Sequence, residues 1–352
     1  MASSMAISWN SSCCVNGSFA DDNNLSSSYP EESQSSVTGW FAFTMAVCVF
    51  GTVLFLLLLT AAVTKGLHHG AGFLIIHISC LQLYLCAVSY PLSTIDIYLA
   101  LIPGTREEER LTLHCQSFLF IFKCAVHAEM WSSVLLAVNR CVAVALPYRY
   151  KEMTTRAMLC SMVGVPWVIA LALNVPLLFG VGMELKRDHP VRYCLAMPNG
   201  DSYSAMYLLM ERFLPLAVKG VLHFALFLHF GIQRVHRNRV VRLLCVPLKT
   251  SLPSRMPRPP QTRNSGSHAH RGGRNMVLAK ILGLSFLWKC VCFLPGPISQ
   301  GIYPNLYSSS KMLQFWMLRT FAVCGYAANP IFFFALSSDY QTALAQLLQH
   351  IL

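Results

Sequence analysis

The residues with the most chemistry to offer are charged side chains that lie inside long apolar segments. Glu129 and Lys289 carry opposite charges, as do Glu211 and Lys123, and Arg319 adds a further cation. A charged side chain in an apolar environment is costly unless it is paired or neutral. Such groups can bind a cation, hold a proton, recognise a charged ligand or pair internally. We therefore treat each as a candidate functional residue, with an internal pair as the structural alternative.

Other residue patterns exclude several chemistries. The histidines are scattered, and none has the His-Glu-x-x-His spacing of a catalytic metal site. We expect no enzymatic activity, no metal and no cofactor. The net charge of +12 raises the question of a nucleic-acid partner. Because the basic residues are concentrated between apolar runs, we expect no nucleic acid and instead expect them to face anionic membrane lipids.

The composition indicates that the elements which position these residues cross a membrane. The chain is 55% hydrophobic and 12% charged, whereas soluble domains contain about 25% charged residues. A helix needs about 20 mostly apolar residues to cross a bilayer. Seven segments qualify: Trp40–Thr64, Ala71–Leu99, Leu113–Leu146, Arg156–Gly180, Ser204–Gln233, Met276–Ile302 and Lys311–Leu336. Since a helix satisfies its own backbone hydrogen bonds in lipid, we predict an all-α membrane protein, a seven-transmembrane helix bundle.

Charge in the connecting segments predicts the orientation of the bundle. Lys and Arg concentrate on the cytosolic side of membrane proteins. The segments after the first and third spans are basic, and residues 234–274 contain Lys and Arg but no acid. The stretch before Trp40 contains neither Lys nor Arg. We therefore place the N-terminus outside the cell and the C-terminus in the cytosol, in a plasma-membrane protein whose first span acts as its membrane signal.

Segments outside the seven-span domain, which we place at 39–336, differ in composition. The extracellular tail 1–38 carries three sequons for N-glycosylation, at Asn10, Asn16 and Asn24. The third cytoplasmic loop, 234–274, is rich in Arg, Pro, Ser and Gly, and we expect it to be disordered. Residues 337–352 have leucines at helical spacing and predict a short amphipathic helix 8 on the inner membrane face.

Short motifs follow one another in a fixed order along the expected spans. They are, in chain order, Cys115, Asn139-Arg140-Cys141, Trp167, Cys194, Pro215, Cys292-Phe293-Leu294-Pro295 and Asn329-Pro330-Ile331-Phe332-Phe333. Over about residues 38–350, this order resembles rhodopsin-like (class A) G-protein-coupled receptors.

The resemblance implies a function and a set of partners. Such receptors bind an extracellular ligand in the outer half of the bundle and activate heterotrimeric G proteins. The resemblance also implies a disulfide between Cys115 and Cys194. Because little chain follows the last span, we expect arrestin and receptor kinases to act through the third cytoplasmic loop. The resemblance assigns coupling and activation to Asn139, Arg140, Pro215, His223, Pro295, Asn329, Pro330 and Phe333.

Several positions depart from the family pattern and point to an altered core site. Gln82 stands where the family has an aspartate that binds sodium, and Glu129 stands where it has a serine. We hypothesise that the acid has moved from the second span to the third. There Glu129 would bind sodium, hold a proton or pair with Lys289, and a protonated structural glutamate is the alternative.

The activation residues depart from the family pattern as well. Asn139 replaces the acid that usually lies beside Arg140, so we expect the family's inner ionic lock to be absent. We therefore predict substantial ligand-independent activity. His223 and Phe333 stand where two tyrosines usually relay activation.

The resemblance places the ligand among residues of the outer half of the bundle. They are Phe122, Lys123, Val126, Glu211, Arg212, Phe293 and Arg319. Phe122 occupies the position of the aspartate that amine receptors use, which disfavours an amine ligand. Lys123 and Arg319 would clamp an anionic small molecule, a lipid acid or an acidic peptide. Alternatively, they pair internally, for example with Asp96 or Glu211.

Two other functions stay open. A transporter or channel would need a path of ionisable residues and usually an internal repeat, which the sequence lacks. A receptor relative that no longer couples to G proteins is the second, because several signature residues are altered. The Asn139-Arg140 pair also occurs in melatonin-like receptors and several invertebrate orphan receptors, and this single link leaves the subfamily open.

Overall fold

We describe a computed structural model that covers residues 34–64, 66, 71–101, 115–146, 148, 150, 154–187, 194–198, 202–244, 265–302 and 310–351. The predicted sequons at Asn10, Asn16 and Asn24 lie outside these residues, and so does the middle of the third cytoplasmic loop, 245–264.

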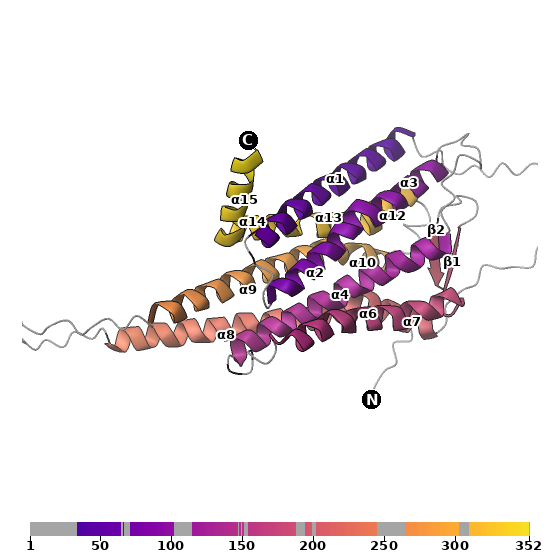
Figure 1. The fold of residues 1–352 in the computed structure, drawn as a ribbon. Coiled ribbons are helices and arrows are strands. Elements are labelled where there is room, and N and C mark those ends of the chain that lie inside the picture. Colours follow the sequence, from indigo (N-terminus) through magenta and orange to yellow (C-terminus); the bar gives the residue numbers. More distant parts are fainter. Residues whose placement is uncertain are drawn as a thin grey trace, which may run out of the picture.

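Long helices dominate the described chain (Figure 1). Several spans are built from consecutive helical pieces, some of them π-helical turns (η). In chain order the elements are α1 (Gln34–Thr64), α2 (Ala71–Tyr84), η1 (Leu85–Ser89), α3 (Tyr90–Leu101), α4 (Cys115–Ala145), α6 (Arg156–Leu178), β1 (Met183–Arg187), β2 (Cys194–Pro198), α7 (Ser202–Leu208), η3 (Leu209–Phe213), α8 (Leu214–Leu244), α9 (Ser265–Phe293), α10 (Pro295–Ile302), α12 (Lys311–Phe315), η4 (Trp316–Thr320), α13 (Phe321–Ala327), α14 (Asn329–Leu336) and α15 (Ser338–Ile351).

The described helices confirm the seven-span bundle. Six of them are long and apolar enough to cross a membrane. A seventh span is counted when the helical segments Met312–Leu336 and Ser338–Leu347 are taken together. The second segment is bent by 97° relative to the first. The part after the bend is α15, the C-terminal helix, which buries Tyr340 and Ala343. Its position after a sharp bend matches the short helix expected over 337–352.

Lipid-facing and core-facing residues separate as expected for a membrane bundle. Large apolar side chains such as Phe224 and Phe227 on α8 are mostly exposed on the outside of the bundle. Polar and charged residues such as Gln82, Glu129 and Lys289 are buried between the helices. This inverted distribution is favourable because hydrocarbon, not water, surrounds a spanning helix.

One end of the bundle is closed by a two-stranded hairpin that the sequence analysis did not predict. Strands β1 and β2 pair antiparallel, with Met183 opposite Pro198 and Arg187 opposite Cys194. Figure 1 shows the hairpin at one end of the bundle, with α15 near the other. The expected disulfide joins Cys194 to Cys115 at the start of α4. The Cys194 backbone N–H also donates to Asp96 Oδ2 on α3 at 2.9 Å, so the hairpin is attached to two spans.

Two expected boundaries need correction. We expected 234–274 to be disordered, but α8 continues to Leu244 and α9 begins at Ser265, so both ends of this segment are helical. The physical reason is that a helix ladder already begun in the membrane extends residue by residue without a new nucleation step. The first span likewise begins at Gln34 rather than Trp40.

Candidate functional site

Two hydrogen-bonded groups of side chains within the described bundle each contain an ion pair. One, which we call the central cluster, contains Gln82, Glu129, Ser285, Lys289 and Asn329. The other, which we call the hairpin-side network, lies nearer the hairpin and contains Lys123, His127, Asn174, Tyr207 and Glu211.

The central cluster is organised around the carboxylate of Glu129 on α4, whose side chain is fully buried. Its Oε1 atom accepts hydrogen bonds from Gln82 Nε2 on α2, at 2.5 Å, and from Lys289 Nζ on α9, which forms an ion pair with it. Gln82 Oε1 accepts from Asn329 Nδ2 at 2.9 Å, and Asn329 Oδ1 accepts from Ser285 Oγ at 2.5 Å. These bonds connect α2, α4, α9 and α14 through one polar chain.

The ion pair explains how a carboxylate and an ammonium can coexist in the apolar core. A buried charge without a partner is strongly destabilising, whereas a hydrogen-bonded pair offsets much of that penalty. Lys289 Nζ also lies 5.3 Å from the centre of the Tyr326 ring, within range of a cation–π contact. Of the three roles considered for Glu129, pairing with Lys289 is the arrangement that the structure contains. Sodium binding and proton storage stay predictions.

A cavity of about 40 Å³ lies beside the central cluster. Glu129, Lys289 and Asn329 line it, together with Lys219 and His223 from α8. A cavity of this size has room for a few water molecules. The Glu129 Oε2 and His223 Nε2 atoms are buried and lack a hydrogen-bond partner among the described residues. The cavity therefore brings unsatisfied polar atoms of α4 and α8 together.

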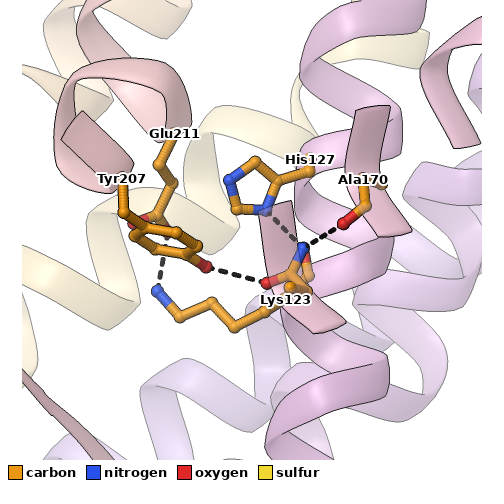
Figure 2. A network of polar contacts seen from close by, with 6 residues as sticks. Lys123, His127, Ala170, Tyr207 and Glu211 are labelled. Carbon is orange, nitrogen blue, oxygen red and sulfur yellow. Dashed lines mark hydrogen bonds and ion pairs between the residues drawn. The ribbon is translucent and has the colours of Figure 1, made fainter. Parts of the chain in front are cut away.

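The hairpin-side network is shown in Figure 2. Lys123 Nζ on α4 lies 2.7 Å from Glu211 Oε1 on η3 and 5.7 Å from the centre of the Tyr207 ring. The Tyr207 hydroxyl donates to Asn174 Oδ1 on α6 at 2.9 Å. Asn174 Nδ2 contacts the Ala170 carbonyl at 2.6 Å and His127 Nδ1 at 3.1 Å. The charge of Lys123 is therefore already balanced by Glu211, which is the internal pair considered as an alternative for this residue.

Two arginines of the expected ligand site lie within the spans, Arg212 on η3 and Arg319 on η4. Arg319 donates a hydrogen bond to Ser93 Oγ. Arg212 is half-buried, and no hydrogen bond or ion pair joins it to another described residue.

The aromatic residues of the expected ligand site border the same region. Phe122 meets the Tyr90 ring edge to face, with 5.3 Å between centroids. Phe293 is buried and packs edge to face on Tyr326, at 5.2 Å. Val126 packs against the main hydrophobic core. Phe122 and Arg319 thus both contact α3, through Tyr90 and Ser93, while Lys123 and Glu211 face one another.

The expected coupling residues Asn139 and Arg140 lie near the end of α4, away from Cys115 at its start. Asn139 is buried and its amide contacts the sulfur of Met162 at 3.7 Å, and Arg140 beside it is buried as well. Asn139 cannot supply a carboxylate to Arg140. The His223 ring lies 5.3 Å from the Phe286 ring, and the Phe333 ring lies 5.4 Å from Tyr340.

The expected prolines lie where helices end or break. Pro295 begins α10 directly after Leu294, where the helical run is interrupted, and Pro330 is the second residue of α14. Pro215 is buried near the start of α8. Proline cannot donate to the helix ladder, so these positions weaken it.

Sequence reasoning missed several residues that the structure brings into these sites. Lys219 lines the central cavity, and Ser285 bonds Asn329 within the central cluster. Tyr207 and Asn174 complete the hairpin-side network. A lysine within an apolar span was a usable indication of a functional position. Single Ser, Tyr and Asn residues carry no such indication, because they are common in spans as structural polar contacts.

Comparisons with known proteins agree with this architecture. The family model described as "7 transmembrane receptor (rhodopsin family)" matches residues 34–333. The human "G-protein coupled receptor 39" is 23% identical over 258 residues, which cover 67% of this chain and 56% of the relative. The "D(2)-like dopamine receptor" of Takifugu rubripes is 24% identical over 194 residues, 54% of this chain and 40% of the relative. The Caenorhabditis elegans "Neuropeptide receptor 22" is 21% identical over 322 residues, which cover 86% of this chain and 67% of the relative. The chain therefore matches about half the length of several of these relatives.

Proposed function

The chain belongs to the rhodopsin family of seven-transmembrane receptors, which signal through G proteins, and we propose that it does so in response to an anionic ligand. The ligand would bind between α3, η3 and η4, in the hairpin-side half of the bundle. Two half-buried guanidinium groups within the spans, those of Arg212 on η3 and Arg319 on η4, are the observation that carries this proposal.

The arrangement of charges favours Arg212 over Lys123 as the partner of Arg319. Lys123 is committed to Glu211, so an incoming anion would have to break an existing ion pair to use it. Arg212 makes no hydrogen bond or ion pair with the other described residues. Guanidinium also matches carboxylate and phosphate groups bidentately. We therefore revise the expected clamp of Lys123 and Arg319 to a clamp of Arg212 and Arg319.

The chemistry of the pocket limits the class of ligand. A lipid acid or a peptide with an acidic end would place its anionic group between the arginines and its apolar part against Phe122 and Phe293. Phe122 offers no counter-charge to an amine, so the ligand named in the dopamine receptors is not carried over. The relatives include receptors with different named ligands, and class A is the level of classification that they share.

The family and the distribution of charge support one orientation for this multi-pass membrane protein. We propose that it lies in the plasma membrane with the hairpin and the glycosylated N-terminal tail outside. Arg140 and the basic third loop then face the cytosol, where the G protein binds. Arrestin and receptor kinases would act on the Ser and Thr residues of that loop.

The experiment is a ligand screen with matched variants. Cells that express the receptor are exposed to fatty acids and to peptides with free acidic ends, and G-protein activation is measured. For an active compound, Arg212→Gln and Arg319→Gln should each reduce potency by about 10- to 100-fold, because each removes a charged hydrogen bond. Arg156→Gln is the control, since Arg156 is exposed at the start of α6.

Two results would overturn the proposal. One is an active ligand whose uncharged amide or ester is equally potent, because the arginines would then have no anion to bind. The other is an unchanged dose-response in both arginine variants at matched surface expression. A receptor that activates no G protein with or without ligand would instead be the non-coupling relative.

A further inference from the structure

The central cavity contains more positive than negative charge. Of the ionisable side chains that line it, Glu129 is the acid, Lys219 and Lys289 are the bases, and His223 is the imidazole. Lys289 already forms an ion pair with Glu129. With Glu129 ionised, both lysines protonated and His223 neutral, the lining carries an excess of one positive charge.

Lys219 is the second ammonium group beside a single carboxylate, because Glu129 already forms an ion pair with Lys289. Its side chain is 6% exposed, and its Nζ atom lies 5.9 Å from the centre of the Phe286 ring. Among the described residues, no carboxylate or carbonyl forms an ion pair or hydrogen bond with it. An ammonium group removed from water is costly when an aromatic face is its principal partner. The site therefore needs a compensating negative group.

His223 supplies a second donor at the same place. It lies one helical turn after Lys219 on α8, and both residues line the cavity. Its Nε2 atom is buried without a hydrogen-bond partner in the described part of the chain. An ammonium and an imidazole N–H that line one small cavity are the donors that a small anion requires.

We propose that the central cavity binds a small monovalent anion of the halide class, held between Lys219 and His223. The volume of about 40 Å³ has room for a small ion together with water and is too small for a large organic anion. A sodium ion is disfavoured, because Lys289 already forms an ion pair with Glu129 Oε1 and the net charge of the lining is positive. The bound anion stabilises the packing of α8 against α9. This inference is independent of the ligand and G protein proposed above.

Chloride is the probe for the test. The full-length receptor is purified in detergent, and its thermal unfolding midpoint, Tm, is measured while chloride replaces gluconate at constant sodium concentration, ionic strength and pH. We expect chloride and bromide to raise Tm saturably, by roughly 2–4 °C, as expected for a ligand that binds only the folded state. Gluconate should leave Tm unchanged, because it is too large for the cavity.

Three variants connect the effect to the cavity. Lys219→Met should lose the chloride dependence and, in gluconate, should be at least as stable as the wild type, because it removes the uncompensated buried charge. Lys219→Arg retains the charge and should keep the dependence. Lys280→Met is the matched control, since Lys280 is an exposed lysine on α9, and it should respond to chloride like the wild type.

Each alternative outcome overturns the proposal. An equal chloride response in Lys219→Met would mean that the ion binds elsewhere. A folded wild type whose Tm is the same in chloride and gluconate would mean that the cavity holds only water. In that case, a Tm that rises with pH would indicate that one of the two lysines loses its proton. The loss of that proton, and not a bound anion, would then remove the excess positive charge.

Discussion

Glu129 and Lys289 each stabilise the charge of the other, so their substitutions should not be additive. Glu129→Gln leaves the Lys289 ammonium without its carboxylate, and Lys289→Met leaves the Glu129 carboxylate without its ammonium. Breaking a buried pair from one side costs about 3–5 kcal/mol, whereas replacing both partners by neutral groups is often close to neutral. We expect both single variants to lower Tm and the double variant to recover most of the loss.

The measurement is a double-mutant cycle on purified protein in detergent. A coupling energy within experimental error of zero would show that the two groups do not form a pair in the folded receptor. The same variants address the sodium hypothesis. Sodium sensitivity in the wild type that disappears in Glu129→Gln would support a sodium site, whereas the ion pair leads us to expect little sensitivity.

At this scale the sequence predicted part of the site. Glu129 and Lys289 were identifiable because charged residues within apolar spans are rare. The roles of Lys123 and Glu211 were not decidable, since a pair with each other and a clamp on a ligand require the same residues. Lys219 was missed although it lies in the middle of the predicted span Ser204–Gln233, because the sequence does not show which residues surround it. Only the packing of α8 on α9 shows that it lines a buried cavity.

Helix packing around the central cluster depends on close approach at Gly51. A Cβ atom added to Gly51 on α1 would lie 2.9 Å from the Cβ of Ala327 on α13, which cannot move aside as a flexible side chain would. Gly39 on the same helix has no atom within 4 Å of its added Cβ. Gly51→Ala should therefore destabilise the receptor by about 1–3 kcal/mol through overpacking.

Gly39→Ala provides the matched control for this prediction. It should be neutral or slightly stabilising, because alanine favours a helix over glycine by up to about 1 kcal/mol. Thermal unfolding of both variants in the same detergent is the measurement. Equal Tm values for the two would contradict the close packing of α1 on α13.

The spans were predictable from sequence because each needs a long apolar run, and that run is visible without knowledge of its neighbours. The residues at which the spans begin and end were harder to predict. The basic residues after Gln233 suggested a loop, but a helix already formed in the membrane continues to Leu244. The hairpin was missed because Met183–Arg187 and Cys194–Pro198 are short and mix polar with apolar residues. Its attachment to Cys115 and Asp96 is a tertiary feature.

In the proposed function, the central cluster lies between an outer ligand site and an inner coupling surface. The hairpin-side network ties α4 to α6, α7 and η3, and the central cluster ties α4 to α2, α9 and α14. Helix α4 also carries Arg140 near its far end. Because Asn139 supplies no carboxylate, the family's ion pair between this position and Arg140 cannot form, and we expect the receptor to signal without ligand.

Basal G-protein activation tests this central claim most directly. The receptor and its Arg140→Ala variant are expressed at matched surface levels, and activation is measured across a panel of Gα subunits. We predict clear ligand-independent activation of at least one subunit by the wild type and its loss in Arg140→Ala. Asn139→Asp should lower the basal activity, because it restores a carboxylate beside Arg140. Basal signalling no higher than in cells without the receptor, or signalling that Arg140→Ala leaves unchanged, would contradict the account.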